Sequence, residues 1–256
     1  MAQTEKSGDG VRAVERALDI LMAFDSAEQQ LTVGELLTRV DLSRPTLYRL
    51  AQTLEQKGFI VSSGKPQRFG LGPAAARLAH LWSSRSGITT VAEPVMRKLW
   101  EQTSETVALL VHQGQYRVCM AELPSPQPLS FRRGVGYSEH VFRGASGRAI
   151  VAFLPDPGPY LDPALPALAR DAVLAELARI RRAGYATSKD ELIRGAVALA
   201  APFFGANGQV QGSLAVFGPS VRLNRDRMDS MANQLLQQSM HLSRALGGSG
   251  AIPERD

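Results

Sequence analysis

The first 71 residues limit the fold most strongly, because they hold three short helical patterns followed by a hairpin pattern. The first, VRAVERALDILMAF at 11–24, spaces its apolar residues three and four apart, as one buried helix face requires. Thr32 and Glu35 form a capping-box pattern at the start of a second helix. Ser43 can cap a third helix, and Pro45 suits its first turn because the N–H that proline lacks has no helical partner there. Three helices with one apolar face each must pack against one another.

Two short apolar runs after the third helix predict a β-hairpin. FIV at 59–61 and RFGL at 68–71 flank SSGKPQ, whose serine, glycine and proline favour a turn. Three helices and a hairpin in this order predict a winged helix-turn-helix domain over residues 11–72. The turn between the second and third helices falls at Asp41, and such turns often need a positive φ, which Asp tolerates better than most residues. We also expect a disordered tail at 1–10, a linker helix at 73–86 and a flexible tail at 247–256.

The exposed side of the third predicted helix has the chemistry of a DNA-contacting surface. Once Leu47, Leu50 and Leu54 face inward, helical periodicity leaves arginine, glutamine and hydroxyl side chains outside. Arginine can pair with guanine and glutamine with adenine, while hydroxyl groups hold phosphates. Residues 42–77 contain six basic residues and one acidic residue, Glu55, a net charge of +5 that equals the formal charge of the whole chain. We therefore expect double-stranded operator DNA as a partner. The expected contacts are Ser43, Arg44, Pro45, Thr46, Tyr48, Arg49 and Gln52 on the helix, with Lys65 and Arg68 at the hairpin tip.

A competing interpretation stays open for this region. Charged helical domains often have a solvated face and bind only protein. In that case the first domain is an oligomerisation module, and the second half is an enzyme or a small-molecule-binding protein.

From residue 87 the pattern changes to one of mixed helices and strands. Asn207-Gly208 between two apolar runs is the strongest short signal for a β-hairpin. We expect one α+β domain with an antiparallel sheet over 87–246. Strands are expected at 106–112, 116–123, 129–131, 197–204 and 210–217, helices at 88–102, 146–154, 171–182 and 224–246, and an irregular proline-rich loop at 155–166.

Composition argues against several classes of protein. Cys119 is the one cysteine, so no internal disulfide can form, and the chain suits a reducing compartment such as the cytoplasm. We expect its thiol to be buried and inert. No apolar run approaches the roughly 18 residues of a membrane span, so no membrane partner is expected. The four histidines are scattered, and residues 144–147 (GASG) do not form a G-x-S-x-G nucleophile motif. We therefore expect neither a metal site, nor a cofactor, nor an enzyme.

The chain resembles the IclR family of bacterial transcription regulators over nearly its whole length. The resemblance lies in VRAVERALDIL, LSRPTLYRLAQTLEQKGFI, RFGLGP, EPVMRKLWEQTSETVALLV, GASGRAIVAFL, RRAGYATSKDELIRGAVALAAPFF and GSLAVFGPS, in this order. It implies a winged-helix domain, a linker helix and a GAF-like effector-binding domain. It also implies homodimers or homotetramers that pair their DNA-binding domains, and an effector that is a small organic acid, an aromatic compound or another metabolite. A ligand-responsive regulator of a catabolic operon, acting as a repressor or an activator, follows from the resemblance.

The resemblance further implies an effector pocket in the second domain. This sequence has apolar residues where a pocket for short organic acids would carry polar ones, and it carries the basic residues Arg132, Arg133 and Arg143 nearby. These features predict a more apolar effector, aromatic or anionic, with an arginine partner. The residues implied to line the pocket are Phe131, Gly144, Ala145, Ser146, Ser188, Ala196, Ala198, Ala215 and Phe217.

Overall fold

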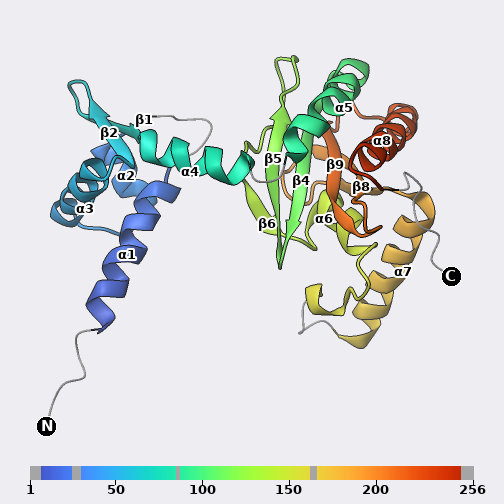
Figure 1. Ribbon diagram of the computed structural model, residues 1–256, viewed down its shortest axis with the longest axis horizontal. Helices are drawn as coiled ribbons and strands as arrows, with labels where there is room; N and C mark the ends of the chain where they lie inside the picture. Colours follow the sequence, from blue (N-terminus) through green and yellow to red (C-terminus); the bar gives the residue numbers. More distant parts are fainter. Residues whose placement is uncertain (1–6, 25–29, 85–86, 162–165, 249–256) are drawn as a thin grey trace, which may run out of the picture. The chain divides into compact units, whose positions relative to one another are not determined.

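The protein divides into two compact units, Met1–Ser86 and Gly87–Asp256 (Figure 1). The structure is a computed structural model that describes residues 7–24, 30–84, 87–161 and 166–248. Residues 1–6 and 249–256, where most of the two expected tails fall, lie outside the described residues. Each unit has its own buried apolar core.

The first unit is a three-helix core with a small sheet. Strands β1, β3 and β2 form an antiparallel sheet in that order, and Ile20, Leu36 and Leu47 from the three core helices are fully buried. The elements are α1 (Ser7–Met22), β1 (Gln30–Thr32), α2 (Val33–Arg39), α3 (Arg44–Gln56), β2 (Ile60–Ser63), β3 (Arg68–Leu71) and α4 (Pro73–Ser84).

Helices α2 and α3 begin where the capping residues in the sequence predict. The Glu35 carboxylate accepts the Thr32 N–H at 2.7 Å while the Thr32 hydroxyl oxygen accepts the Glu35 N–H at 3.2 Å, so the capping box forms. Ser43 takes the N-cap position of α3, but its side chain makes no cap hydrogen bond and pairs with the Thr46 hydroxyl at 2.9 Å.

Two expectations about this unit are wrong. The expected positive φ at Asp41 is absent, because α2 ends on Val40 in an extended conformation and the turn closes through a Leu42 N–H to Val40 O hydrogen bond of 3.0 Å. The part of the expected tail at residues 7–10 is helical, since α1 begins at Ser7. These residues contain no proline, and extending an existing helix costs far less than starting one.

The second unit is a six-stranded antiparallel sheet with helices on both faces (Figure 1). The strand order is β6-β5-β4-β9-β8-β7, and Asn207-Gly208 lies in the tight connection between β8 and β9. Helices α5 and α8 pack on one face, while α6 packs on the other and contacts α7. The elements are α5 (Ile88–Thr103), β4 (Thr106–Gln113), β5 (Tyr116–Leu123), β6 (Ser138–His140), α6 (Gly144–Val151), the 3-10 turn η1 (Gly158–Tyr160), α7 (Ala167–Ala183), β7 (Ala186–Lys189), β8 (Ala196–Phe204), β9 (Val210–Pro219) and α8 (Arg225–Ala245).

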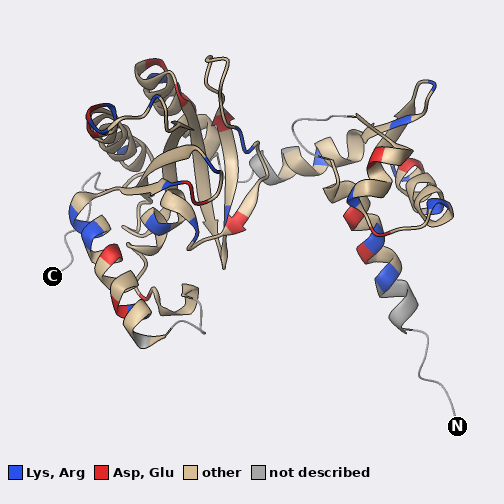
Figure 2. Ribbon diagram, turned by 180° about the vertical axis from the view of Figure 1, so that it is seen from behind, with Lys and Arg blue, Asp and Glu red and all other residues tan. Residues whose placement is uncertain are grey.

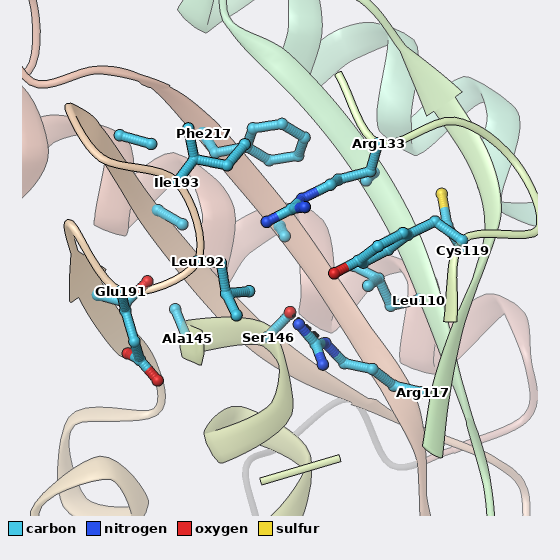
Figure 3. A pocket seen from close by; sticks show the side chains of 16 residues that line it. Leu110, Arg117, Cys119, Arg133, Ala145, Ser146, Glu191, Leu192, Ile193 and Phe217 are labelled. Atoms are coloured by element: carbon cyan, nitrogen blue, oxygen red, sulfur yellow. Dashed lines mark hydrogen bonds between the residues drawn. The ribbon is translucent and has the colours of Figure 1, made fainter. Parts of the chain in front are cut away.

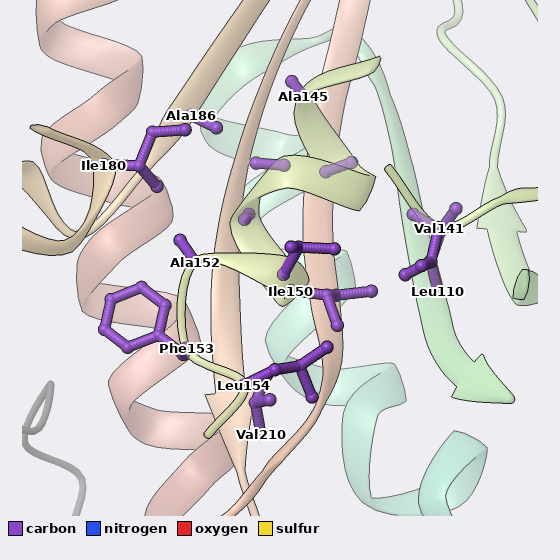
Figure 4. Packing of buried hydrophobic residues seen from close by; sticks show 14 of the residues in the cluster. Leu110, Val141, Ala145, Ile150, Ala152, Phe153, Leu154, Ile180, Ala186 and Val210 are labelled. Carbon is purple, nitrogen blue, oxygen red and sulfur yellow. The ribbon is translucent and has the colours of Figure 1, made fainter. Parts of the chain in front are cut away.

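Strand alternation assigns side chains to the two faces of this sheet. Ala200 on β8 and Ala215 on β9 join the cluster around α6, where Ile150 and Ala145 pack against the sheet and Ile180 of α7 (Figure 4). Their strand neighbours, such as Leu199 and Val216, are equally buried and lie outside that cluster, so they face the side that carries α5 and α8.

The strand expected at 129–131 does not form. The Leu129 carbonyl accepts a hydrogen bond from Arg222 Nη1 at 2.8 Å, and the Phe131 carbonyl accepts one from the Thr106 hydroxyl at 2.8 Å. Because side chains take both carbonyls, this segment does not enter the sheet, and β6 at Ser138–His140 becomes the edge strand instead. Among the described helices, none is long and apolar enough to cross a membrane.

Candidate functional site

The exposed face of α3 carries most of the residues expected to contact DNA. Leu47, Leu50, Ala51 and Leu54 are buried in the core of the first unit. The opposite side of the helix is therefore left to solvent. Ser43, Arg44, Pro45, Tyr48, Arg49 and Gln52 are exposed there, and Thr46 is half-buried.

The β2–β3 hairpin adds basic residues beside α3, as the basic positions in Figure 2 show. Lys65 lies in the turn between the two strands and is exposed. Arg68 differs from expectation, because it begins β3 and does not lie at the tip. Its Nη1 donates to the Gln30 carbonyl at 3.3 Å and lies 3.9 Å from the Glu35 carboxylate. Arg68 thus holds β3 against β1 and α2, and only part of its guanidinium is left for another partner.

The hairpin is also tied to α3. Glu55, near the end of α3, accepts hydrogen bonds from the Ser62 N–H at 3.0 Å and the Ser62 hydroxyl at 2.6 Å. A hollow between helix and hairpin is lined by Tyr48, Arg49 and Gln52 on one side and Gln67 on the other. Helix and hairpin therefore form one continuous surface.

A cavity lies in the second unit, between the sheet, the start of α6 and the 190–195 loop (Figure 3). The cavity itself has a volume of about 70 Å³, and the hollow measures about 610 Å³ when the open space at its mouth is included. Seven of the nine residues expected in an effector pocket line it: Ala145, Ser146, Ser188, Ala196, Ala198, Ala215 and Phe217.

The other two expected residues, Phe131 and Gly144, do not line the cavity. The Phe131 carbonyl is bonded to Thr106, as described above. The Gly144 N–H, at the start of α6, donates to the Glu191 carboxylate at 2.7 Å, so it is not free for a ligand oxygen. A β-carbon at Gly144, whose φ is +72°, would lie 2.8 Å from Leu192 Cδ1, so glycine lets the 190–195 loop approach.

Sequence reasoning missed the most unusual residue of the cavity, Arg117 on β5. Its side chain is only 2% exposed. Its Nε donates to the Ser146 hydroxyl at 2.6 Å and its Nη1 to the His140 carbonyl at 3.0 Å. Burial lowers the pKa of Arg117 to about 10, so the guanidinium remains charged at neutral pH.

Of the three arginines near residue 132 singled out in the sequence, only Arg133 lines the cavity. Its guanidinium carbon lies 4.6 Å from the centre of the Tyr137 ring, a cation–π contact. Arg132 is exposed, and Arg143 pairs with Glu139 at 3.3 Å outside the cavity. Burial raises the pKa of the Tyr137 phenol, which donates to Glu139 at 2.9 Å.

The 190–195 loop closes one side of the cavity with Glu191, Leu192 and Ile193. Arg148 of α6 donates to both Glu191 carboxylate oxygens at 2.8 Å. Arg148 also lies 3.1 Å from the Glu176 carboxylate on α7. These bonds fix the loop to α6.

The cavity offers little support for catalysis. Cys119 is buried in its wall, and burial raises the pKa of its thiol to about 12, so the nucleophilic thiolate is scarce at neutral pH. No group of three or more metal-ligating side chains that could hold a metal ion occurs in the described parts of the chain.

Comparison with known proteins finds matching families over both units. The profile described as IclR helix-turn-helix domain matches residues 13–64, and the one described as bacterial transcriptional regulator IclR C-terminal matches residues 80–244. The chain is 28% identical to the HTH-type transcriptional regulator BhcR of Paracoccus denitrificans, covering 98% of this chain and 91% of that protein. It is 30% identical to an HTH-type transcriptional regulator of Mycobacterium tuberculosis, covering 80% of this chain and 81% of the relative.

Solved structures resemble the fold. The IclR protein of Thermotoga maritima superposes with a TM-score of 0.73 at 23% identity, covering 93% of this chain and 99% of that one. Two matched profiles together span both units, and the matched relatives are regulators of transcription, not enzymes. The winged helix-turn-helix unit and the α+β unit with its antiparallel sheet therefore have a common origin with these proteins, and the chain belongs to the IclR family of bacterial transcriptional regulators.

Proposed function

We propose that this protein is a ligand-responsive transcriptional regulator whose α3 contacts operator DNA and whose cavity holds the effector. The observation that carries the proposal is the exposed α3 face, where Arg44 and Arg49 point to solvent from a helix whose other side is core. A helix with this division can enter the major groove, with arginine on base edges and hydroxyl groups on phosphates. Operator DNA lies in the cytoplasm, so the regulator works there.

The cavity supports the ligand-responsive part of the proposal. It is mostly apolar, and a few polar groups converge in it, as in typical ligand sites. An effector that fits one conformation of this domain better shifts the protein toward it, and operator affinity changes with the same coupling free energy. Control of a catabolic operon by its own metabolite would be the physiological use.

Exposed apolar residues on α1 support a homodimer. Val14, Leu18 and Met22 lie four residues apart on one stripe and are 59%, 53% and 82% exposed. Such a stripe is costly in water and suits a second copy of the same helix. Pairing two DNA-binding units places two α3 helices on half-sites one helical turn apart. Further association into a tetramer is consistent with this arrangement.

Fluorescence anisotropy on an operator selected from random DNA tests the proposal. Arg44→Ala and Arg49→Ala should each weaken specific binding by about 1–3 kcal/mol. Arg97→Ala is a matched control, since Arg97 is an exposed arginine on α5 paired with Glu93. Affinity should fall steeply with salt because phosphate contacts release counterions. Full operator affinity in both α3 variants would favour the alternative, a small-molecule-binding or enzymatic domain with an N-terminal oligomerisation module.

A further inference from the structure

The cavity contains positive charge with no carboxylate partner. Among the described residues, no carboxylate forms an ion pair with the guanidinium of Arg117 or Arg133. The Arg117 hydrogen bonds go to a hydroxyl and a carbonyl, both neutral. A buried charge without a counter-ion is costly, so such groups are normally paired.

The carboxylates around these arginines are already engaged. Glu122 accepts the backbone N–H groups of Arg133 at 2.9 Å and Gly134 at 3.2 Å. Glu139 accepts the Tyr137 phenol and pairs with Arg143. Glu191 pairs with Arg148 and accepts the Gly144 N–H at the start of α6. The chain's own carboxylate thus occupies the helix N-terminus that could otherwise hold an anion. Glu139 and Glu191 act on Arg117 only from a distance, without direct contact.

The geometry also shows where an anion would lie. Figure 3 shows the guanidinium groups of Arg117 and Arg133 both directed into the cavity, with Ser146 beside Arg117. A β-carbon placed on Gly144 would lie 3.5 Å from Arg117 Nη2, so this nitrogen lies beside the start of α6.

Most of the rest of the wall is apolar, with Glu191, Tyr137 and Ser188 as its polar members. Phe217 and Ile193 lie on the side away from Arg117 in Figure 3. An apolar group placed against these two side chains would leave water without losing a hydrogen bond. The remaining apolar lining is Ala108, Leu110, Ala196, Ala198 and Ala215.

We infer that the effector is a monoanion with an apolar body, such as an aromatic or branched monocarboxylate, and that Arg117 and Arg133 bind its anionic group. The inference rests on the proposed function for the role of the ligand, but not for its chemistry. Planar guanidinium forks suit carboxylate oxygens, while the mostly apolar remainder of the wall and the Glu191 carboxylate disfavour a second anionic group.

Isothermal titration calorimetry on the full chain tests the inference with matched pairs of acids and amides. The probes are benzoate, phenylacetate, 3-phenylpropanoate and 3-methylbutanoate, each beside its primary amide. At least one acid should bind, and about tenfold or more tightly than its amide, the usual effect of a charged hydrogen-bonding partner. Short polar acids such as glyoxylate, and dianions such as succinate, should bind more weakly.

Two variants test whether Arg133 and Arg117 bind the anionic group. Arg133→Gln, at a half-buried position, should remove about tenfold of acid affinity and leave the amide within twofold. Arg132→Gln is the matched control, because Arg132 is the exposed neighbour outside the cavity. Arg117→Met should act like Arg133→Gln. Arg133→Gln alone decides the question if the Arg117 variant does not fold.

Several results would overturn the inference: binding of amides as tightly as acids, unchanged acid affinity in Arg133→Gln, or no binding by any acid of the panel. Operator affinity is measured separately on the same protein, with and without the bound acid. If the protein binds the acid more tightly than the amide but its operator affinity is the same with and without the acid, the inference is upheld and the ligand-responsive function is refuted.

Discussion

Replacement of Arg222 by Met should strongly destabilise the second unit, because it leaves a buried carboxylate without its main partner. Glu105 is fully buried between the end of α5 and the start of β4. Arg222 donates to both of its oxygens, Nε to Oε1 at 2.9 Å and Nη2 to Oε2 at 2.7 Å. Gly218 faces Glu105 so closely that a β-carbon there would overlap Oε2, so the carboxylate has no room to move away.

The size of the effect follows from what remains after the substitution. Removing one partner of a buried ion pair costs about 3–5 kcal/mol. Arg227 stays 3.6 Å from Glu105 Oε1 and offsets part of the loss, while the Arg222 bond to the Leu129 carbonyl also disappears. We expect a loss of about 3 kcal/mol, which lowers the melting temperature of a unit of this size by about 6–12 °C.

Urea unfolding followed by far-UV circular dichroism and tryptophan fluorescence measures this loss. The two units can give two transitions, so the one reported by Trp100 on α5 is compared between variants. Arg97→Ala, which breaks an exposed pair within α5, is the control and should cost about 0.5 kcal/mol or less.

A loss below about 1 kcal/mol in Arg222→Met, or one equal to that of Arg97→Ala, would refute the reasoning. Adding Glu105→Gln should recover part of the loss, because a neutral amide in the same place leaves no unpaired charge.

Three further outcomes are expected. Gly147→Ala should cost about 3 kcal/mol or more in thermal unfolding, because the new β-carbon would overlap the Val141 carbonyl, which belongs to rigid backbone. Hydrogen bonds from the Thr32 backbone and side chain lower the pKa of Glu35 below its ordinary value of 4.5. The stability this gives the first unit is present above that value and is lost as pH falls through the lower pKa; Glu35→Gln should remove this part of the pH dependence in urea titrations. Burial raises the pKa of Cys119 to about 12, so iodoacetamide should leave it unlabelled at pH 8 until the protein unfolds; labelling at the rate of a free thiol would show the side chain to be open.

Local patterns allowed much of the fold to be predicted. The capping box at Thr32 and the hairpin at Asn207-Gly208 depend on residues a few positions apart, so the sequence contains their whole signal. Strand β1 was missed, because it is three residues long and its pairing partner, β3, lies about 40 positions away. The error at Asp41 has another cause, since more than one turn geometry can join two helices and the sequence does not choose between them.

The two candidate sites also differ in how far apart in the sequence their residues lie. Helical periodicity alone gives the exposed face of α3, once its buried leucines are identified. Arg117 contacts Ser146 and His140, which lie 29 and 23 positions away, so no local pattern joins them. The sequence did contain one signal. Arg117 and Cys119 lie two positions apart on β5 and so share one face of the strand, and a charged residue on the same face as a buried cysteine is unusual enough to indicate a site.

The structure limits where the proposed effector can act on the second unit. A ligand shifts an equilibrium only through contacts that differ between two conformations. The alanines and Phe217 in the cavity wall belong to paired strands β8 and β9, whose backbone hydrogen bonds resist change. Arg133 and Glu191 lie instead on segments outside the sheet, and both carry charge at the cavity. We therefore expect the proposed anion to change the contacts of these two segments first, because their charged contacts can be remade while the sheet stays intact.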